Sequence, residues 1–245
     1  MKVPLMLVPG LLCDARLWQP QLQALGDIAE MTVADVTRDD SIAAMAGRVL
    51  ATAPDRFALA GLSMGGYVAQ EMIRRAPERV LRLALLDTNA RADNGAQKKR
   101  RAELIALAQR GTFKGVTPRL LPLLIHPDRL TDTPLVDTIM TMAESVGKDA
   151  FLRQQRAIMD RVDGREALRD IRCPTLVLCG REDAITPPKV HEEMAERIAD
   201  AVLVVINHCG HLSTLERPER TTAALRAWLT TPVMSSLYFC CHRRA

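Results

Sequence analysis

Short apolar runs alternate with helix-like segments through most of this chain. Val3–Val8, Phe57–Leu62 and Val80–Leu86 are almost wholly apolar, and uninterrupted runs of this length are typical of strands buried on both faces of a parallel sheet. A helical pattern follows each run, as expected where crossover helices join parallel strands. The sequence therefore predicts an α/β fold with a mostly parallel central sheet and helices on both faces.

The other expected elements extend this pattern and divide the chain. We expect further strands at residues 31–36, 174–179 and 201–206, and helices at residues 16–25, 41–53, 66–76, 187–199 and 218–229. Between residues 91 and 172 no strand pattern is found, and helical spacing predicts four helices at 96–109, 118–125, 134–146 and 149–162. The predicted organisation is a core from residues 1–90 and 173–231, a helical insertion at 91–172, and a loosely held tail at 232–245.

Composition favours a globular protein that acts on small molecules. The chain of 245 residues is 48% apolar and 25% charged, with a net charge of +4 and charges of both signs interspersed. Nothing in this balance requires a nucleic-acid or membrane partner. The first apolar run is too short to span a bilayer and lacks a signal-peptide cleavage site, so we expect a cytoplasmic protein. The six cysteines show no metal-binding spacing and are expected to be reduced, with Cys13 and Cys209 as packing residues.

The stretch Gly61-Leu62-Ser63-Met64-Gly65 lies where a predicted strand turns into a predicted helix. This is the setting of a nucleophile elbow, in which a serine is held in a tight, strained turn. Tiny residues are needed two positions before and after the serine so that the backbone segments can approach each other. Ser63 is therefore a candidate nucleophile, although so short a motif also arises by chance.

A serine nucleophile needs a histidine to take its proton and a carboxylate to orient that histidine. Asp183 lies in the loop after the predicted strand at 174–179, and His211 lies in the loop after the strand at 201–206. Their neighbours remain open as alternatives: His208 for the base, and Glu182 or Asp87 for the acid.

Together these three motifs resemble those of the α/β-hydrolase superfamily, over about residues 3–229. The matching patterns are G-x-S-x-G around Ser63, G-x-x-D-x-x-x-P at residues 180–187, and Gly210-His211. The resemblance implies the α/β-hydrolase fold, with residues 91–172 as a cap and with Ser63, Asp183 and His211 as the catalytic triad. It also implies an oxyanion hole formed by the backbone N–H groups of Met64 and Leu11, with Leu12 as the alternative to Leu11. The first-strand loop reads Pro9-Gly10-Leu11 where the family usually carries His-Gly.

The expected activity is hydrolysis of a small-molecule carboxylic ester through an acyl-enzyme, without a cofactor or metal ion. Few aromatic residues and an apolar cap favour small to medium aliphatic acyl groups; the apolar cap residues are Leu104, Leu107, Leu120, Leu121, Leu124, Met140 and Met142. The cationic run Lys98–Arg101 is expected to form a solvated face of the cap. Alternatives are a cofactor-free perhydrolase or haloperoxidase, a thioesterase, a lactonase, a C–C hydrolase, or a small-molecule receptor with this fold.

Overall fold

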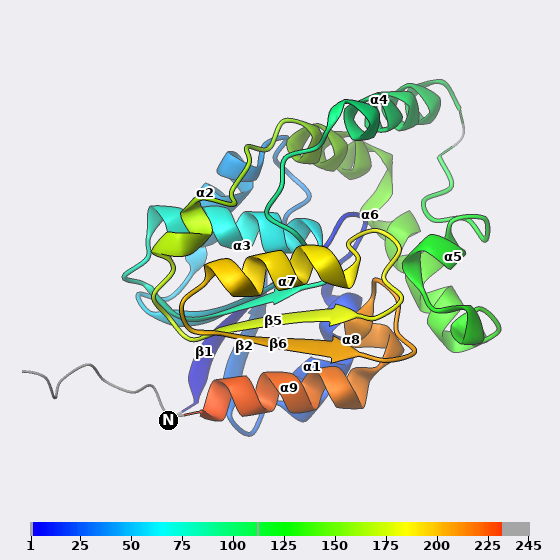
Figure 1. The fold of residues 1–245 in the computed structure, drawn as a ribbon. Helices are drawn as coiled ribbons and strands as arrows, with labels where there is room; N and C mark the ends of the chain where they lie inside the picture. The colour runs from blue at the N-terminus through cyan, green and yellow to red at the C-terminus, as the bar shows by residue number, and fades with distance from the viewer. Residues whose placement is uncertain (1, 112, 232–245) are drawn as a thin grey trace, which may run out of the picture.

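The computed structural model describes residues 2–111 and 113–231, which form a six-stranded parallel sheet (Figure 1). The strand order is β2-β1-β3-β4-β5-β6, and each neighbouring pair runs parallel. The strands span Val3–Val8 (β1), Ala29–Val33 (β2), Phe57–Leu62 (β3), Val80–Leu86 (β4), Thr175–Gly180 (β5) and Ala201–Ile206 (β6). The predicted α/β fold is confirmed.

The second strand is the one whose predicted bounds differ most from those in the structure. β2 pairs with β1 from Ala29 to Val33 and then leaves the ladder, so the prediction at residues 31–36 lies too far along the chain. Val36 is nevertheless buried, and its carbonyl accepts a hydrogen bond from Gln154 Nε2 at 3.2 Å. The apolar residue Val36 is thus buried beneath another segment rather than by strand pairing.

Helices cover both faces of the sheet (Figure 1). One face carries α2 (Ile42–Thr52), α3 (Met64–Arg75) and α7 (Pro188–Arg197); the other carries α1 (Gln19–Ala24), α8 (Ser213–Glu216) and α9 (Pro218–Thr230). A 3-10 turn, η1 (Ala15–Trp18), precedes α1. Alternate residues of β1 supply the two cores, because successive side chains of a strand point to opposite faces. Leu5 and Leu7 pack on the α1 and α9 side, and Met6 and Val8 pack on the α2 and α3 side.

Between β4 and β5 the chain forms helices and no strand among the described residues, and this segment is called the insertion below. It contains α4 (Gly95–Arg110), α5 (Leu121–Leu124), η2 (Pro127–Arg129), α6 (Thr133–Met159) and η3 (Ala167–Asp170). The two helices expected at 134–146 and 149–162 follow each other within α6, which is broken at Gly147, where φ is 80°. The helix expected at 118–125 is reduced to the single turn α5. In Figure 1, α5 lies beyond the ends of β5 and β6 toward which their arrows point.

The cationic run on α4 is only partly solvated. Lys98, Lys99 and Arg100 are exposed, as predicted, but Arg101 turns inward to the buried carboxylate of Asp93. Arg161 contacts the same carboxylate at 2.7 Å, and Arg101 Nη1 also donates to Gln155 on α6 at 2.8 Å. A buried carboxylate needs such partners, so Arg101 connects the two long helices of the insertion. The charge pattern of α4 alone cannot show this, because Asp93 lies before the helix.

The described residues also bear on two further expectations, those for membrane-spanning helices and for the cysteines. Across residues 2–111 and 113–231, none of the helices has the length and apolar character that a membrane crossing requires. Cys13, Cys173, Cys179 and Cys209 are free thiols, and burial raises the pKa of the Cys13 thiol to about 12. That environment suits the packing role expected for Cys13. The predicted tail at 232–245 lies outside the described residues.

Candidate active site

Ser63 occupies the turn between β3 and α3 in a conformation that non-glycine residues seldom adopt. Its φ is 55° and its ψ is −117°. A Cβ atom at Gly65 would lie 2.0 Å from the carbonyl oxygen of Val8, and one at Gly61 would lie 2.3 Å from the carbonyl oxygen of Gly65. Neither position can hold a side chain unless backbone atoms move. The strained turn and its two glycines therefore agree with the expected elbow.

The structure brings Ser63, His211 and Asp183 together. His211 Nε2 lies 2.8 Å from Ser63 Oγ, and His211 Nδ1 lies 2.8 Å from Asp183 Oδ2. The three residues come from the loops that follow β3, β6 and β5, where the carboxyl ends of parallel strands meet. His211 and Asp183 are each 3% exposed, so bulk water has little access to the pair.

Asp183 is held in its ionised form. Its Oδ1 accepts hydrogen bonds from the backbone N–H groups of Ile185 and Thr186 at 2.8 Å each, and its Oδ2 accepts one from Thr186 Oγ1 at 2.7 Å. Burial disfavours the carboxylate, but the charge of His211 and these hydrogen bonds outweigh burial, so the pKa of Asp183 lies below its usual value. The carboxylate is therefore oriented and charged for its contact with His211.

The pKa of His211 is shifted in the opposite direction, above its ordinary value. Burial disfavours the imidazolium form, but the negative charge of Asp183 and the hydrogen bond to it outweigh burial, so the pKa of His211 is raised. A histidine with this environment is a stronger base than a free one. It can take a proton from Ser63 Oγ and hold it near Asp183.

His208 and Glu182, two of the alternatives left open by the sequence, make their contacts outside the Ser63–His211–Asp183 set. His208 is 70% exposed and lies 3.5 Å from Asp128 through Nδ1. Glu182 accepts a hydrogen bond from the backbone N–H of Cys209 at 3.0 Å. His208 thus contacts the insertion, and Glu182 contacts the loop that carries His211. The short contacts to Ser63 and Asp183 are made by His211.

Asp87, the third alternative, lies behind the site and supports it. Its carboxylate accepts hydrogen bonds from the backbone N–H groups of Gly180 and Ser213 at 3.1 Å each and from Ser213 Oγ at 2.5 Å. These partners lie at the start of the loop carrying Asp183 and just after His211. Burial and the nearby charge of Asp183 raise the pKa of Asp87 to about 8. Asp87 therefore joins the acid and base loops rather than orienting the histidine ring.

The predicted oxyanion donors lie on the two expected segments. Met64 is the first residue of α3, where N–H groups have no acceptor within the helix. The N–H of Leu12, the alternative donor, is engaged by Gln154 Oε1 at 3.0 Å. No hydrogen bond within the described residues uses the N–H of Leu11. The geometry therefore favours Leu11 over Leu12, and the pair of Leu11 and Met64 remains a prediction.

Glu216 is a residue of the site that the sequence does not reveal. It is fully buried and accepts hydrogen bonds from the backbone N–H groups on both sides of His211, those of Gly210 and Leu212, at 3.1 Å each. It also accepts one from the N–H of His126 in the insertion at 2.7 Å. Burial raises the pKa of Glu216 although these donors oppose the shift. Glu216 thus fixes the histidine loop and ties it to the insertion.

A second buried histidine supports the serine turn. His191 Nε2 accepts a hydrogen bond from the backbone N–H of Thr88 at 2.9 Å, and Thr88 Oγ1 donates to the carbonyl oxygen of Ser63 at 2.8 Å. Burial lowers the pKa of His191 to about 4, so its ring is neutral and able to accept at Nε2. The hydrogen bonds from His191 on α7 through Thr88 to Ser63 therefore hold the elbow in place.

A cavity of about 460 Å³ lies away from these residues. It is lined by α2, α3 and the segment at residues 160–173, with Tyr67, Arg74 and Arg161 on its walls. Neither Ser63 nor His211 lines it. The cavity is therefore separate from the chemistry described above.

The sheet topology, the serine at a strained strand-to-helix turn, and the histidine and aspartate on later loops define an α/β hydrolase. In agreement, the sequence model described as the Alpha/beta hydrolase family matches residues 5–225. The chain belongs to the alpha/beta hydrolase family.

Similar proteins within this fold differ in what their names say they act on. A thermophilic esterase from Thermogutta terrifontis is 31% identical, with a TM-score of 0.83 over 94% of this chain and 90% of its own. The enol-lactonase from Burkholderia xenovorans LB400 is 25% identical, with a TM-score of 0.82 over 94% of this chain and 92% of its own. A protein of Azorhizobium caulinodans provisionally named carbamate hydrolase RutD is 27% identical over 88% of this chain and 87% of its length.

Proposed function

We propose that the protein is a serine hydrolase that cleaves carboxylic esters through an acyl-enzyme. The observation that carries this proposal is the continuous contact from Ser63 Oγ to His211 Nε2 and from His211 Nδ1 to Asp183 Oδ2, each 2.8 Å long. The esterase and the lactonase similar to this chain support cleavage of a C–O acyl bond. No cofactor takes part in the proposed reaction.

The geometry supports the following sequence of steps. Ser63 Oγ attacks the ester carbonyl carbon while His211 Nε2 takes its proton. The amides of Met64 and Leu11 stabilise the oxyanion, each by about 3 kcal/mol. His211 then passes the proton to the leaving alkoxide, and an alcohol departs. Water attacks the acyl-enzyme with His211 as base, which releases the carboxylic acid and restores Ser63.

We propose further that residues 91–172 form a cap over this site and select the acyl group. Apolar residues of the insertion join the same core as Leu12, in the loop after β1, and Leu212, which follows His211. These insertion residues include Leu121, Ile125, Ile139 and Met142. A pocket bounded by such side chains excludes water and favours an aliphatic chain. Small to medium acyl groups remain the favoured substrates, because much of this apolar surface is used in packing the insertion itself.

The proposal is tested by a series of p-nitrophenyl esters from acetate upward in acyl length, followed by labelling with a fluorophosphonate. We expect hydrolysis with the highest kcat/KM among the short and medium chains, and covalent labelling on the peptide that contains Ser63. The matched protein Ser145→Ala, which alters an exposed serine on α6, should retain both properties.

Two results would argue against the proposal in different ways. Labelling of Ser63 without measurable turnover of any ester would favour a receptor that retains the triad. Turnover that peaks with long acyl chains would contradict the substrate size but leave the mechanism in place.

The pH dependence of the reaction follows from the environment of His211. The histidine must be neutral to accept the proton of Ser63, and its pKa is raised above the ordinary value of 6.5. We therefore expect kcat/KM to rise with pH and to reach half its maximum above pH 6.5. Asp183→Asn removes the charge that raises this pKa, so its profile should shift to lower pH while kcat falls by about 10⁴-fold. An unshifted profile in that variant would contradict the assigned contact.

A further inference from the structure

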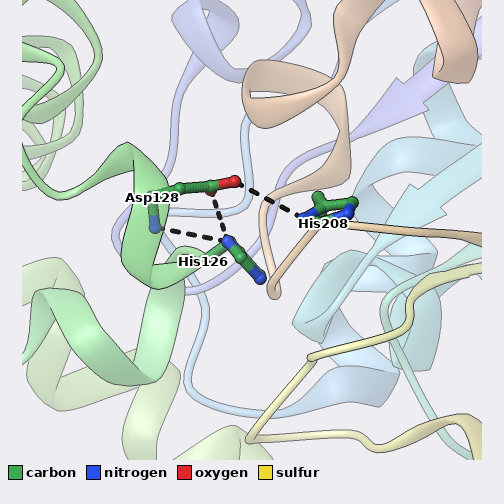
Figure 2. Close-up of side chains that lie close together, drawn as sticks. All are labelled: His126, Asp128 and His208. Carbon is green, nitrogen blue, oxygen red and sulfur yellow. Dashed lines mark hydrogen bonds and ion pairs between the residues drawn. The ribbon is translucent and has the colours of Figure 1, made fainter.

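Three side chains of metal-binding type lie together outside the candidate active site (Figure 2). His126 and Asp128 belong to the segment from the end of α5 through η2, and His208 belongs to the loop after β6. Asp128 Oδ1 contacts His126 Nδ1, and Asp128 Oδ2 lies 3.5 Å from His208 Nδ1. The two imidazole rings meet edge to face with centroids 5.4 Å apart. Two distant segments of the chain thus present two imidazoles and one carboxylate to the same space.

This set of donors suits a divalent transition metal of the zinc class, which binds histidine nitrogen and carboxylate oxygen together. One ligand atom from each residue lies within 4.8 Å of the other two. Two ligands on one tetrahedral zinc ion lie about 3.4 Å apart, because each bond is about 2.1 Å long. Small side-chain movements suffice to close the difference, and the side chains of Asp128 and His208 are 49% and 70% exposed. Three protein ligands would leave a fourth position for water.

His126 Nδ1 and Asp128 Oδ1 already face each other, in a contact whose proton a metal ion could replace. The backbone N–H of Asp128 donates to His126 Nδ1 at 3.3 Å, which requires a lone pair on that nitrogen. The same nitrogen contacts the carboxylate oxygen of Asp128, which also carries lone pairs. Unless a proton or a cation lies between them, these groups repel each other. Lone pairs of both side chains therefore point into one small region.

Arg217 supplies the charge that opposes a metal ion here. Its Nη2 lies 3.5 Å from both carboxylate oxygens of Asp128, and its Nε donates to the carbonyl oxygen of His208 at 2.6 Å. The shorter bond involves no ligand atom and can persist with a metal bound. The longer contacts are the ones that a metal ion would replace. The guanidinium lowers the affinity of the site but leaves its ligands accessible.

We propose that His126, Asp128 and His208 form a binding site for a zinc-class divalent ion that joins the insertion to the core. His208 lies in the same loop as His211, and the N–H of His126 shares the Glu216 carboxylate with the N–H of Gly210. A bound ion therefore restrains the loop that carries His211 without contacting Ser63. The site is independent of the proposed ester hydrolysis, since its three ligands take no part in that reaction.

The test is a titration of tag-free, full-length protein with Zn²⁺ at pH 7.5 by isothermal calorimetry, after treatment with a chelator. Cys240, Cys241 and His242 are also metal-binding residue types, so every protein in the series carries Cys240→Ser, Cys241→Ser and His242→Ala. We expect one zinc ion per chain in this parent. His126→Asn and His208→Asn should each weaken binding by about 10-fold or more, since even residues that only orient ligands contribute 10- to 100-fold.

Asparagine is chosen because it preserves the backbone at both positions. At residue 126 it can accept the N–H of Asp128 as His126 does, and at residue 208 it tolerates the positive φ of 55°. Asp137→Asn, at an exposed acid on α6, is the control and should bind zinc as the parent does. Arg217→Gln should bind more tightly.

The proposal is overturned if the parent shows no one-to-one binding at micromolar zinc, or if His208→Asn binds as tightly as the parent. His208 is an exposed side chain, so its variant provides this outcome even if His126→Asn fails to fold.

Discussion

Replacement of Ser63 by alanine is expected to lower kcat for a p-nitrophenyl ester by about 10⁶-fold, since loss of a serine nucleophile has an effect of this order. Ser63 Oγ is the atom that lies 2.8 Å from His211 Nε2, and no acyl-enzyme can form without it. The residual rate should be that supported by the oxyanion hole and by substrate binding alone. Steady-state kinetics with active-site titration provide the measurement.

This loss should not come from unfolding. Alanine can adopt the backbone of Ser63 at the same cost as serine, and the hydroxyl contributes one described hydrogen bond, to His211. We therefore expect the melting temperature to change little. The double variant Ser63→Ala, His211→Ala should be no slower than Ser63→Ala, because the two residues act as one unit. A variant that keeps more than about 1% of the parent rate would be incompatible with Ser63 as the nucleophile.

The sheet could be predicted because complete burial leaves continuous apolar runs. Phe57–Leu62 and Val80–Leu86 show this clearly, since each predicted strand has the bounds found in the structure. β2 was misplaced because Val36 is buried without pairing in the sheet, with its carbonyl bonded to Gln154 of α6. The length of α5 was overestimated for a related reason, since apolar residues at helical spacing do not fix where hydrogen bonding stops.

The proximity of Ser63, Asp183 and His211 was also predictable, because each follows a strand of a parallel sheet and such strands end at one edge. Glu216 was not. Its partners are the backbone N–H groups of His126, Gly210 and Leu212, and backbone groups leave no mark in a sequence. The available signal was a lone carboxylate after the uncharged stretch 212–215, which shows neither its burial nor its partners.

Glu216 therefore provides the second strong prediction, on stability and activity together. Glu216→Ala would leave three N–H groups without their acceptor in a region where the carboxylate is fully buried. Each buried donor left unsatisfied costs about 1–3 kcal/mol, so the free energy of unfolding should fall by about 3 kcal/mol or more. Glu196→Ala, at an exposed glutamate on α7, is the matched control and should change stability by less than about 0.5 kcal/mol.

The conservative variant Glu216→Gln separates a positioning role from a merely structural one. Glutamine keeps one carbonyl oxygen and the volume of the side chain. Its NH₂ group, however, must face at least one of the three N–H donors, which belong to His126, Gly210 and Leu212. We expect a smaller loss of stability than in Glu216→Ala, together with a clear fall in kcat at temperatures where the variant is fully folded. Urea unfolding and ester kinetics on the same preparation measure the two effects. If kcat per folded molecule equals that of the parent, Glu216 stabilises the loop but does not position His211 for the reaction.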